Sequence, residues 1–424
     1  MPISERLYYA DPFLKAFSAI VTQVREIPGA SGESVWQLAL DRSAFYPTSG
    51  GQPFDTGILR ATSGSGAGLE IPVDQVDEDD DGQVWHYAGG PIAAGAPVEG
   101  VLNWDRRFDH MQQHTGQHLL SAVFRRELQA PTVSFHLGES VSTIDLACGP
   151  LAHHSLERVE RIANEIIGED RPVTIQTVSR ADAESLLISG VLHKLPEREG
   201  SIRLIDIADC DRNACGGTHV RSTGQIGGLL VRRIEKVTRG VRVEFVCGMR
   251  AVRAARADLG ILTELSAFLS SGSPELPAAV SRLQNESKAM GRERQKLREE
   301  LAAYQGAAMA QEEASENGLR LVARTWKDRD RDYVRLLASR TVSAAPSTAA
   351  IFTAKDAEPA RVFVARSRDL DFNCGQIMRE ALAQFGLRGG GSPDLAQGDI
   401  AADREPELHA VVVKAIREAT GNIG

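Results

Sequence analysis

Short runs of alternating apolar and polar residues, separated by glycine, proline and aspartate, fill the first hundred positions of the chain. They lie at positions 19–27, 34–43, 57–62, 69–76, 83–89 and 96–103. A period of two puts alternate side chains on one face of a strand, and short strands at this spacing favour a small closed or stacked sheet. The pattern therefore predicts a small β-barrel or sandwich over residues 1–100.

Helical periodicity then takes over. A helix is predicted over 105–129, with an apolar face formed by Leu119, Leu120, Val123, Phe124 and Leu128. Shorter helices are predicted over 155–167 and 180–189, and strands at positions 134–138, 141–147, 172–179, 202–209, 226–237 and 241–248. Helices mixed with mostly local strands predict an α+β domain of two layers over residues 101–250.

A helical segment with a heptad stripe comes next. Its members recur in steps of three and four at Val280, Leu283, Ser287, Met290, Arg294, Leu297, Leu301 and Tyr304. The stripe resembles a coiled-coil seam weakened by one serine and one arginine. Two interpretations remain open, an antiparallel hairpin within one chain, turning at 272–277, and a helix for self-association.

The last hundred residues return to an α/β pattern. Strands are predicted at 320–326, 333–339, 349–354 and 361–367, and helices at 375–385 and 407–419. Between these two helices lies the glycine-rich stretch GLRGGGSPDLAQGD, residues 386–399.

The composition is that of an ordinary globular protein, with 42% hydrophobic and 25% charged residues among 424. At roughly 150 residues per domain, this length predicts about three domains. We find no apolar run long enough for a bilayer and no signal-peptide pattern, so we expect a cytoplasmic protein without a membrane partner. Five scattered cysteines cannot form a disulfide framework for this length, and we expect reduced thiols.

Charge is unevenly distributed along the chain. The formal net charge of −9 argues against nucleic-acid binding by the whole surface. Residues 221–256, however, contain nine Lys or Arg against two Glu, a local net charge of +7. This segment is predicted to meet phosphates.

Three histidines, His110, His114 and His118, follow one another at intervals of four in the stretch DHMQQHTGQHLLSAVF. Side chains four apart share one face of a helix, so two of these imidazoles can reach one metal ion. A hundred residues later, Cys215 and His219 offer the thiolate and imidazole that zinc prefers, with two intervening glycines that let the backbone bend.

Four protein ligands would complete a tetrahedron, which is typical of structural zinc, whereas catalytic zinc keeps a position for water or substrate. The sequence leaves both possibilities open. A third histidine from one helix would crowd the site, so we expect His110 to be a partner of a ligand or to cap the helix start.

Three motifs together carry a resemblance. CGGTH, HTGQHLL and FYPTSGGQPFDTG resemble the editing domain of alanyl-tRNA synthetases and the free-standing alanyl-tRNA editing proteins of the AlaX family, over about residues 5–250. Residues 255–424 resemble the C-terminal DHH-associated domain of these synthetases, which makes the chain similar to the long AlaX type. We find neither an aminoacylation domain nor the DHH motif of phosphoesterases.

The resemblance implies an α+β multidomain fold. Its parts are a β-barrel domain over 1–100, a two-layer zinc-binding editing domain over 101–254, a helical hairpin or coiled-coil linker over 255–316 and a DHH-associated domain over 317–424. The last of these is expected to bind tRNA and to form a homodimer.

The resemblance also assigns residues. The zinc ligands would be His114, His118, Cys215 and His219, with Cys215, His114 and His136 catalytic. The substrate would be bound by Ser43, Gly50, Gly51, Gln52 and Arg203, and Ser43 stands where many relatives carry threonine. The tRNA would be bound by Arg232, Arg233, Lys236, Arg239, Gly389, Gly390 and Gly391.

The implied activity is zinc-dependent hydrolysis of the ester in mischarged aminoacyl-tRNA, with Ser-tRNA(Ala) and Gly-tRNA(Ala) as the expected substrates. No carboxylate is clearly placed as general base, although Asp109 and Asp211 flank the ligand motifs. Two alternatives remain, a noncatalytic tRNA-binding or RNA-binding protein with a structural zinc, and a deacylase for another aminoacyl-tRNA such as threonyl-tRNA.

Overall fold

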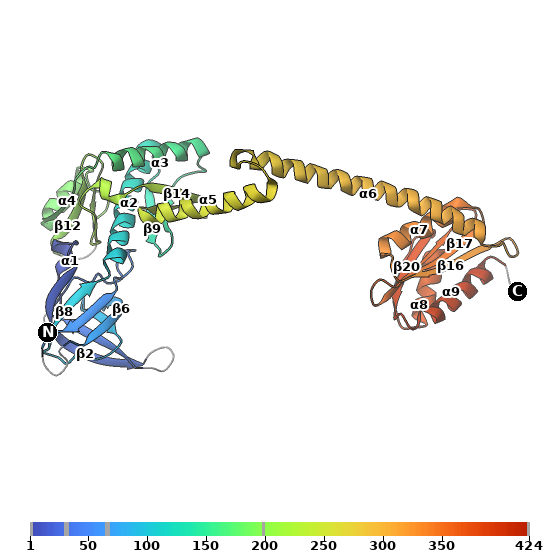
Figure 1. Cartoon of the computed structure of the whole chain (residues 1–424), viewed down its shortest axis with the longest axis horizontal. Helices are drawn as coiled ribbons and strands as arrows, with labels where there is room; N and C mark the ends of the chain where they lie inside the picture. Colours follow the sequence, from blue (N-terminus) through green and yellow to red (C-terminus); the bar gives the residue numbers. More distant parts are fainter. Residues whose placement is uncertain (1–2, 29–33, 64–67, 197–199, 422–424) are drawn as a thin grey trace. The chain divides into compact units, whose positions relative to one another are not determined.

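The computed structural model describes residues 3–28, 34–63, 68–196 and 200–421, and the chain divides into two compact units, residues 1–264 and 265–424. The blue, cyan and green elements of Figure 1 belong to the first unit, and the orange and red elements belong to the second. Among the described residues, no helix combines the length and the apolar character that crossing a membrane requires.

The first unit begins with a closed barrel. Its described strands are antiparallel neighbours in the order β2 (Ala16–Pro28), β3 (Ser34–Leu40), β7 (Val84–Ala88), β6 (Glu70–Glu78), β5 (Gly57–Ala61) and β8 (Pro97–Leu102). Alternate residues, such as Phe17, Ala19 and Val21 on β2, point into an apolar core. The predicted barrel is thus confirmed, and the sandwich alternative is not.

Before the barrel lie two short elements that the sequence pattern does not predict. Strand β1 (Glu5–Arg6) pairs in parallel with β4 (Arg42–Ser43), and the one-turn helix α1 (Leu7–Ala10) follows β1. Two-residue strands carry too little alternation to be recognised from sequence.

The rest of the first unit is a helical layer on β-sheets. Helices α2 (Trp104–Leu128) and α3 (His153–Gly168) pack on a four-stranded sheet of order β14 (Leu229–Val237), β15 (Gly240–Cys247), β10 (Ser142–Leu146) and β9 (Thr132–Leu137). A second sheet contains β11 (Val173–Val178), β12 (Ile202–Ile207) and β13 (Asp211–Ala214). Helix α4 (Arg180–Ile188) and the 3₁₀ turn η1 (Thr223–Ile226) complete this part.

Helix α2 is buried on its polar side as well as on its apolar face. Leu119, Leu120, Val123 and Phe124 lie in the core as predicted, but polar residues such as Gln113 and Thr115 are fully buried too. A helix surrounded by protein must satisfy such polar groups internally, and this is where the candidate site lies.

Helix α5 (Met249–Leu269) spans the boundary between the units. After the end of α5, the second unit continues with the turn η2 (Ser273–Glu275) and the long helix α6 (Leu276–Glu312). Six apolar members of the heptad stripe on α6 are exposed, between 43% for Leu301 and 77% for Tyr304. Both helices and the turn confirm the predicted elements, whereas self-association of the stripe remains a prediction.

A five-stranded sheet forms the body of the second unit. Its order is β16 (Arg320–Trp326), β17 (Thr348–Ala354), β18 (Ala360–Arg366), β20 (Leu395–Ile400) and β19 (Gly389–Gly391), and only the first pair is parallel. Helices α7 (Arg331–Ala344), α8 (Cys374–Ala383) and α9 (Glu405–Ala419) complete the unit, and two apolar clusters form its core.

The predicted strand at 333–339 is wrong, because these residues belong to α7. Asp330 caps this helix by accepting a hydrogen bond from the Tyr333 N–H, and its buried residues are Tyr333, Val334, Leu337, Ala338, Thr341 and Val342. This spacing in steps of three and four is helical, and it extends beyond the short window that suggested a strand. The glycine-rich stretch, for which no strand was predicted, contains the edge strand β19 and most of β20.

Candidate metal centre

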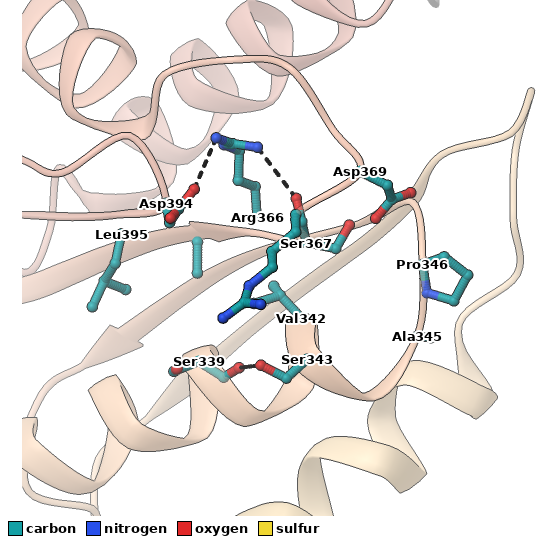
Figure 2. A pocket seen from close by; sticks show the side chains of 12 residues that line it. Ser339, Val342, Ser343, Ala345, Pro346, Arg366, Ser367, Asp369, Asp394 and Leu395 are labelled. Carbon is teal, nitrogen blue, oxygen red and sulfur yellow. Dashed lines mark hydrogen bonds and ion pairs between the residues drawn. The ribbon is translucent and has the colours of Figure 1, made fainter.

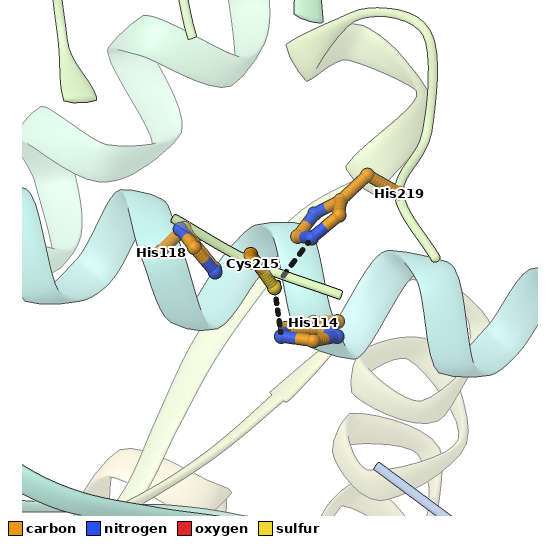
Figure 3. Close-up of side chains that lie close together, drawn as sticks. All are labelled: His114, His118, Cys215 and His219. Carbon is orange, nitrogen blue, oxygen red and sulfur yellow. Dashed lines mark hydrogen bonds between the residues drawn. The ribbon is translucent and has the colours of Figure 1, made fainter. Parts of the chain in front are cut away.

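The four residues proposed as metal ligands converge in the first unit. One ligand atom from each of His114, His118, Cys215 and His219 lies within 4.8 Å of all the others. The two histidines of α2 face the same side of the helix, and Cys215 and His219 reach them from the turn after β13 (Figure 3). The three imidazoles are buried, and Cys215 is half-buried.

Hydrogen bonds on the outer nitrogens orient the imidazoles. His114 Nδ1 lies 2.8 Å from Gln52 Oε1, which also accepts the Thr218 backbone N–H at 3.0 Å and is therefore the amide oxygen. His118 Nδ1 lies 3.2 Å from a carboxylate oxygen of Asp211.

Because an amide oxygen and an ionised carboxylate only accept, both Nδ1 atoms must donate. The Nε2 lone pairs of His114 and His118 are then available to a metal, and the outer hydrogen bonds hold both rings in place. His219 Nδ1 makes a corresponding contact of 3.1 Å with the Thr115 hydroxyl.

The spacing fits a tetrahedral zinc ion. Cys215 Sγ lies 3.4 Å from His114 Nε2 and 3.3 Å from His219 Nε2. Zinc bonds of about 2.3 Å to sulfur and about 2.0 Å to nitrogen at tetrahedral angles put these atoms about 3.5 Å apart. The donor set, one sulfur and three nitrogens, is also one that zinc prefers. The residues therefore fit zinc, and His114, His118, Cys215 and His219 would hold it.

The electrostatics favour a thiolate at this position. Burial alone would raise the pKa of the Cys215 thiol, but His114 and His219 beside it lower that pKa well below its usual range. Burial also depresses the pKa of His219, so this imidazole is neutral. Zinc binds a thiolate and neutral imidazoles. Although burial lowers the pKa of His118, its hydrogen bonds to Asp211 and Cys215 raise it to about 10, so zinc must displace a proton from this imidazole.

Arg203 secures the turn that carries Cys215. Its Nη1 donates to the carbonyl oxygens of Cys215 at 2.8 Å and Gly217 at 2.9 Å, and its Nε donates to Tyr9 O at 3.2 Å. Arg203 was predicted to bind substrate, and that role is untested. The hydrogen bonds show that it positions the ligand turn, while its buried Nη2 has no partner among the described residues.

Gly217 is required by the close approach of two segments. A Cβ at this residue would lie 2.1 Å from His114 Cε1 and 3.0 Å from Gln52 Oε1. Gly216 has more room, with the nearest atom, Tyr9 Oη, at 3.6 Å. Of the two glycines in the motif, Gly217 is the one that allows the turn to reach the α2 histidines.

The predicted glycine loop is a tight turn beside the cluster. Ser49 and Gln52 exchange backbone hydrogen bonds of 3.2 and 2.9 Å, and Gly50 and Gly51 between them have φ of 55° and 82°. Positive φ at both central positions is typical of a type I′ turn and favours glycine. The Gln52 amide is fully buried and holds His114, so the structure shows it in a positioning role; its predicted substrate contact is untested.

Phe135 was missed by the sequence analysis. Its ring lies 5.7 Å from the His114 ring and against Gly51, where a Cβ would come within 2.8 Å of it. Neighbouring residues on β9 point to opposite faces, so the structure does not bring the exposed His136 to the cluster. A shift of one position along a strand moves a side chain to the other face of the sheet, so the fold was needed to distinguish Phe135 from His136.

Ser43 lies on the short strand β4 and is fully buried. Its hydroxyl is 2.7 Å from His86 Nε2, and His86 Nδ1 is 2.9 Å from the carbonyl oxygen of Leu38. Because that carbonyl only accepts, Nδ1 carries the proton and the Ser43 hydroxyl donates to Nε2. The predicted contact of Ser43 with substrate remains untested.

His110 is separate from the metal ligands. It is 1% exposed, and Asn103 caps α2, so the predicted helix-capping role of His110 is wrong. Its Nδ1 has no hydrogen-bond partner among the described residues. Of the acids near the motifs, Asp109 forms an ion pair with Arg250, and Asp211 orients His118.

The residues predicted to bind tRNA are not part of the four-residue cluster, and those on β14 lie on the surface. Arg232, Arg233, Lys236 and Arg239 are exposed on β14 and the turn that follows it. Arg232 pairs with Asp258 and Arg233 with Glu235, leaving less free charge than the sequence count suggested. Gly389, Gly390 and Gly391 form β19 in the second unit, and their contact with RNA is untested.

The second unit has a cavity of about 550 Å³ beside α7 and β18 (Figure 2). Arg366 there forms an ion pair of 2.8 Å with Asp394 and donates to the carbonyl oxygen of Ser367. This cavity contains none of the residues predicted to bind tRNA, and one of its two arginines, Arg366, is already engaged in an ion pair.

Two family models match the chain. The model for the Threonyl and Alanyl tRNA synthetase second additional domain matches residues 202–243, which include β12, β13 and the ligand turn. The DHHA1 domain model matches residues 318–418, which cover the five-stranded sheet, α7, α8 and nearly all of α9, but not α6.

A relative that matches over nearly its whole length confirms the resemblance. The chain is 28% identical to the alanyl-tRNA editing protein AlaX-L of Pyrococcus horikoshii, over 97% of this chain and 98% of that protein. It is 32% identical to the alanine–tRNA ligase of Pyrococcus abyssi over 94% of this chain, which spans 42% of the ligase. The C-Ala domain of Aquifex aeolicus alanyl-tRNA synthetase covers 26% of this chain at 21% identity, with a TM-score of 0.23.

Proposed function

We propose that this chain, which is similar over 97% of its length to the alanyl-tRNA editing protein AlaX-L of Pyrococcus horikoshii, is an aminoacyl-tRNA deacylase. Its proposed reaction is hydrolysis of the ester that joins a wrong amino acid to tRNA, with Ser-tRNA(Ala) and Gly-tRNA(Ala) as substrates. The observation that carries the proposal is the convergence of His114, His118, Cys215 and His219 within 4.8 Å.

The residues around the cluster have distinct tasks in this proposal. Zinc, when bound, would supply a Lewis acid for the ester carbonyl and a water of lowered pKa. Gln52 and Asp211 hold the two α2 imidazoles with Nε2 facing inward, and Arg203 holds the Cys215 turn. The turn at Gly50 and Gly51, packed beside His114 through Phe135, would form the wall next to the amino acid.

A substrate panel tests the activity. Alanyl-, seryl-, glycyl- and threonyl-tRNA would be incubated with the protein, and the remaining ester would be measured over time. We expect hydrolysis of seryl- and glycyl-tRNA(Ala) and survival of alanyl-tRNA(Ala). Fastest loss of threonyl-tRNA would instead support the related threonyl specificity, and stability of every ester would refute the deacylase.

Cys215→Ala, with Cys210→Ala as its control, tests the site. Cys210 lies five positions earlier and outside the four-residue cluster, and burial raises its pKa to about 11, so it is a thiol. We expect Cys215→Ala to lose hydrolysis and bound zinc, whereas Cys210→Ala keeps both. Hydrolysis by Cys215→Ala at the wild-type rate would contradict the assignment.

A noncatalytic RNA-binding protein with structural zinc is the second candidate, because four protein ligands already complete a tetrahedron. Metal removal separates the two. If zinc is catalytic, the apo protein keeps its circular dichroism spectrum and thermal unfolding profile but loses hydrolysis, and zinc restores it. If zinc is structural, the first unit unfolds when the metal is removed.

The second unit is proposed to bind the tRNA body and to form the dimer. Support comes from the DHHA1 match over residues 318–418 and from the exposed apolar stripe on α6.

A further inference from the structure

An open groove lies in the first unit beside the amino-terminal turns of α2 and α5. A cavity of about 520 Å³ there is lined by His110, Trp104, Phe108 and Arg253, among others. A second cavity of about 460 Å³ adjoins it, because both are lined by Asp109, Glu139, Arg250 and Arg253. The second cavity extends to Arg232, one of the residues predicted to meet tRNA.

His110 gives this groove an unsatisfied buried polar group. The side chain is 1% exposed and lines the first cavity, and Nδ1 has no partner in the described part of the chain. Buried polar atoms are nearly always hydrogen-bonded, and because Nδ1 is itself covered by protein, a ligand in the groove would satisfy it only after a small rotation of the side chain. His110 is also one helical turn before the ligand His114, about 6 Å along the axis of α2.

The charges favour a ligand with few negative charges. Arg250 is neutralised by Asp109 at 2.9 Å, and Arg106 lies 3.3 Å from Glu139. Arg253 is exposed and has no ion pair among the described residues, and two helix amino termini add partial positive charge. Asp105, also in the cavity, partly offsets them. One phosphodiester fits this balance better than a polyphosphate does.

Aromatic residues supply an apolar wall. The rings of Trp104 and Phe108 are stacked with centroids 5.8 Å apart, and Phe13 extends the cluster to 5.6 Å from Trp104. Lys15 lies 4.7 Å above the Trp104 ring, and Arg221 lies 4.1 Å above Phe13. Aromatic rings bordered by cations are typical of surfaces that bind single-stranded nucleic acid.

We propose that this groove binds the unpaired nucleotides at the 3′ end of tRNA, with Arg253 contacting a phosphodiester and His110 a ribose or base hydrogen-bonding group. The inference rests on the proposed function, because it takes tRNA as the substrate. An unpaired strand would run from the groove toward the metal cluster, which the ester at its terminus must reach.

The test uses the full-length protein and an uncharged RNA hairpin of the acceptor arm, with and without its single-stranded 3′ CCA. Binding is followed by fluorescence anisotropy at fixed salt. We expect the protein to prefer the hairpin that ends in CCA. Arg253→Glu should weaken binding of that hairpin by roughly tenfold, because a phosphate contact is lost and a repulsive charge is added, and should barely affect the truncated hairpin.

Arg256→Glu is the matched control. Arg256 is also exposed on α5, has no ion pair in the part of the chain that the structure describes and lines neither cavity. It should leave the preference for CCA unchanged. Equal losses from Arg253→Glu and Arg256→Glu, or no preference in the wild type, would overturn the inference.

His110→Gln supplies an independent arm, with an expected loss of roughly threefold to tenfold in the preference for CCA. If this variant binds the CCA hairpin as tightly as the wild type does, His110 does not contact the RNA. Competition by millimolar inorganic phosphate alone would identify a simple anion site and would also contradict the inference. A protein that deacylates but shows no preference for CCA contradicts only this inference, and one that shows the preference without deacylation contradicts only the proposed function.

Discussion

Gly216 and Gly217 are adjacent and chemically identical, yet their surroundings differ. Of the two, only Gly217 would place a Cβ against the His114 ring, at 2.1 Å. A Cβ at Gly216 would have no atom nearer than 3.6 Å. The His114 ring cannot give way without breaking its hydrogen bond to Gln52. The conformation of the ligand turn therefore depends on a contact with a helix a hundred residues earlier.

The pair yields a prediction. Gly217→Ala should displace His114 and lower zinc affinity by roughly 100-fold, in the range found when residues that orient ligands are changed. Gly216→Ala should bind zinc nearly as tightly as the wild type does. Competition with a zinc chelator measures both, and equal affinities of the two variants would show that the contact at Gly217 is unimportant.

His86 predicts a dependence of stability on pH. Burial lowers the pKa of this histidine to about 4, against about 6.5 in an unfolded chain. The unfolded state therefore takes up a proton between pH 6.5 and 4 that the folded state does not, so stability is lost as the pH falls through this window. The loss attributable to His86 is roughly 3 kcal/mol.

Thermal unfolding between pH 7 and pH 4 tests this. His86→Gln can still donate to Leu38 and accept from Ser43 but does not titrate, so its midpoint should fall less with decreasing pH. The exposed His153→Gln serves as control and should follow the wild type. Parallel curves for all three proteins would contradict a buried neutral His86. His110, whose pKa burial lowers to about 3, contributes in the same direction in every variant.

Among the elements, α2 connects the barrel to the metal centre. Arg107 and Asp55 form a fully buried ion pair, and the same guanidinium donates to the carbonyl oxygens of Pro12 and Ala44. Asp55 in turn accepts the Tyr46 N–H at 2.7 Å. These bonds hold the segment before the glycine turn against the helix that carries two ligands.

Breaking this connection should be costly. Arg107→Ala leaves the Asp55 carboxylate buried without its charge partner, and we expect a loss of about 3–5 kcal/mol in the free energy of unfolding. Arg106→Ala, the neighbouring residue with a partly exposed pair to Glu139, should cost less than about 1 kcal/mol. Urea denaturation compares the two, and similar losses would show that the buried pair has no special role.

The elements also show how far sequence patterns reach. Barrel strands such as β2 and β6 are nine residues long or longer, begin with a clear alternation of exposed and buried residues, and are predicted well. Strand β13 has three polar residues and one alanine, all half-buried, with no alternation to detect. The error at 333–339 came from a sequence window shorter than the helix. His114, His118, Cys215 and His219 are predictable because their types and spacing are rare, whereas Phe135 has no such signature.

At the scale of the whole molecule, the stripe on α6 remains without a partner among the described residues. Its apolar members are exposed at heptad spacing, and such a surface is stabilised when a second helix covers it. The stripe thus supports the proposed homodimer.

Light scattering tests the homodimer. Met290→Glu with Leu297→Glu places two charges in the stripe and should shift the mass from dimer to monomer. Gln295→Glu adds a charge to the other side of α6, where Gln295 bonds to Glu299, and should leave the mass unchanged. A wild-type protein that is monomeric at high micromolar concentration would refute the homodimer.

The sequence by itself determined the barrel pattern, the long helix with its histidines, the thiolate turn and the likeness to editing proteins, because each depends on periodicity or on rare residues at short spacing. The tertiary structure decided which residues of these segments contact one another. Gln52 and Asp211 orient histidines on another element, Gly217 makes room for His114, and His110 faces a groove rather than the metal. These contacts join residues 62 to 103 positions apart, and a local pattern carries no information about them.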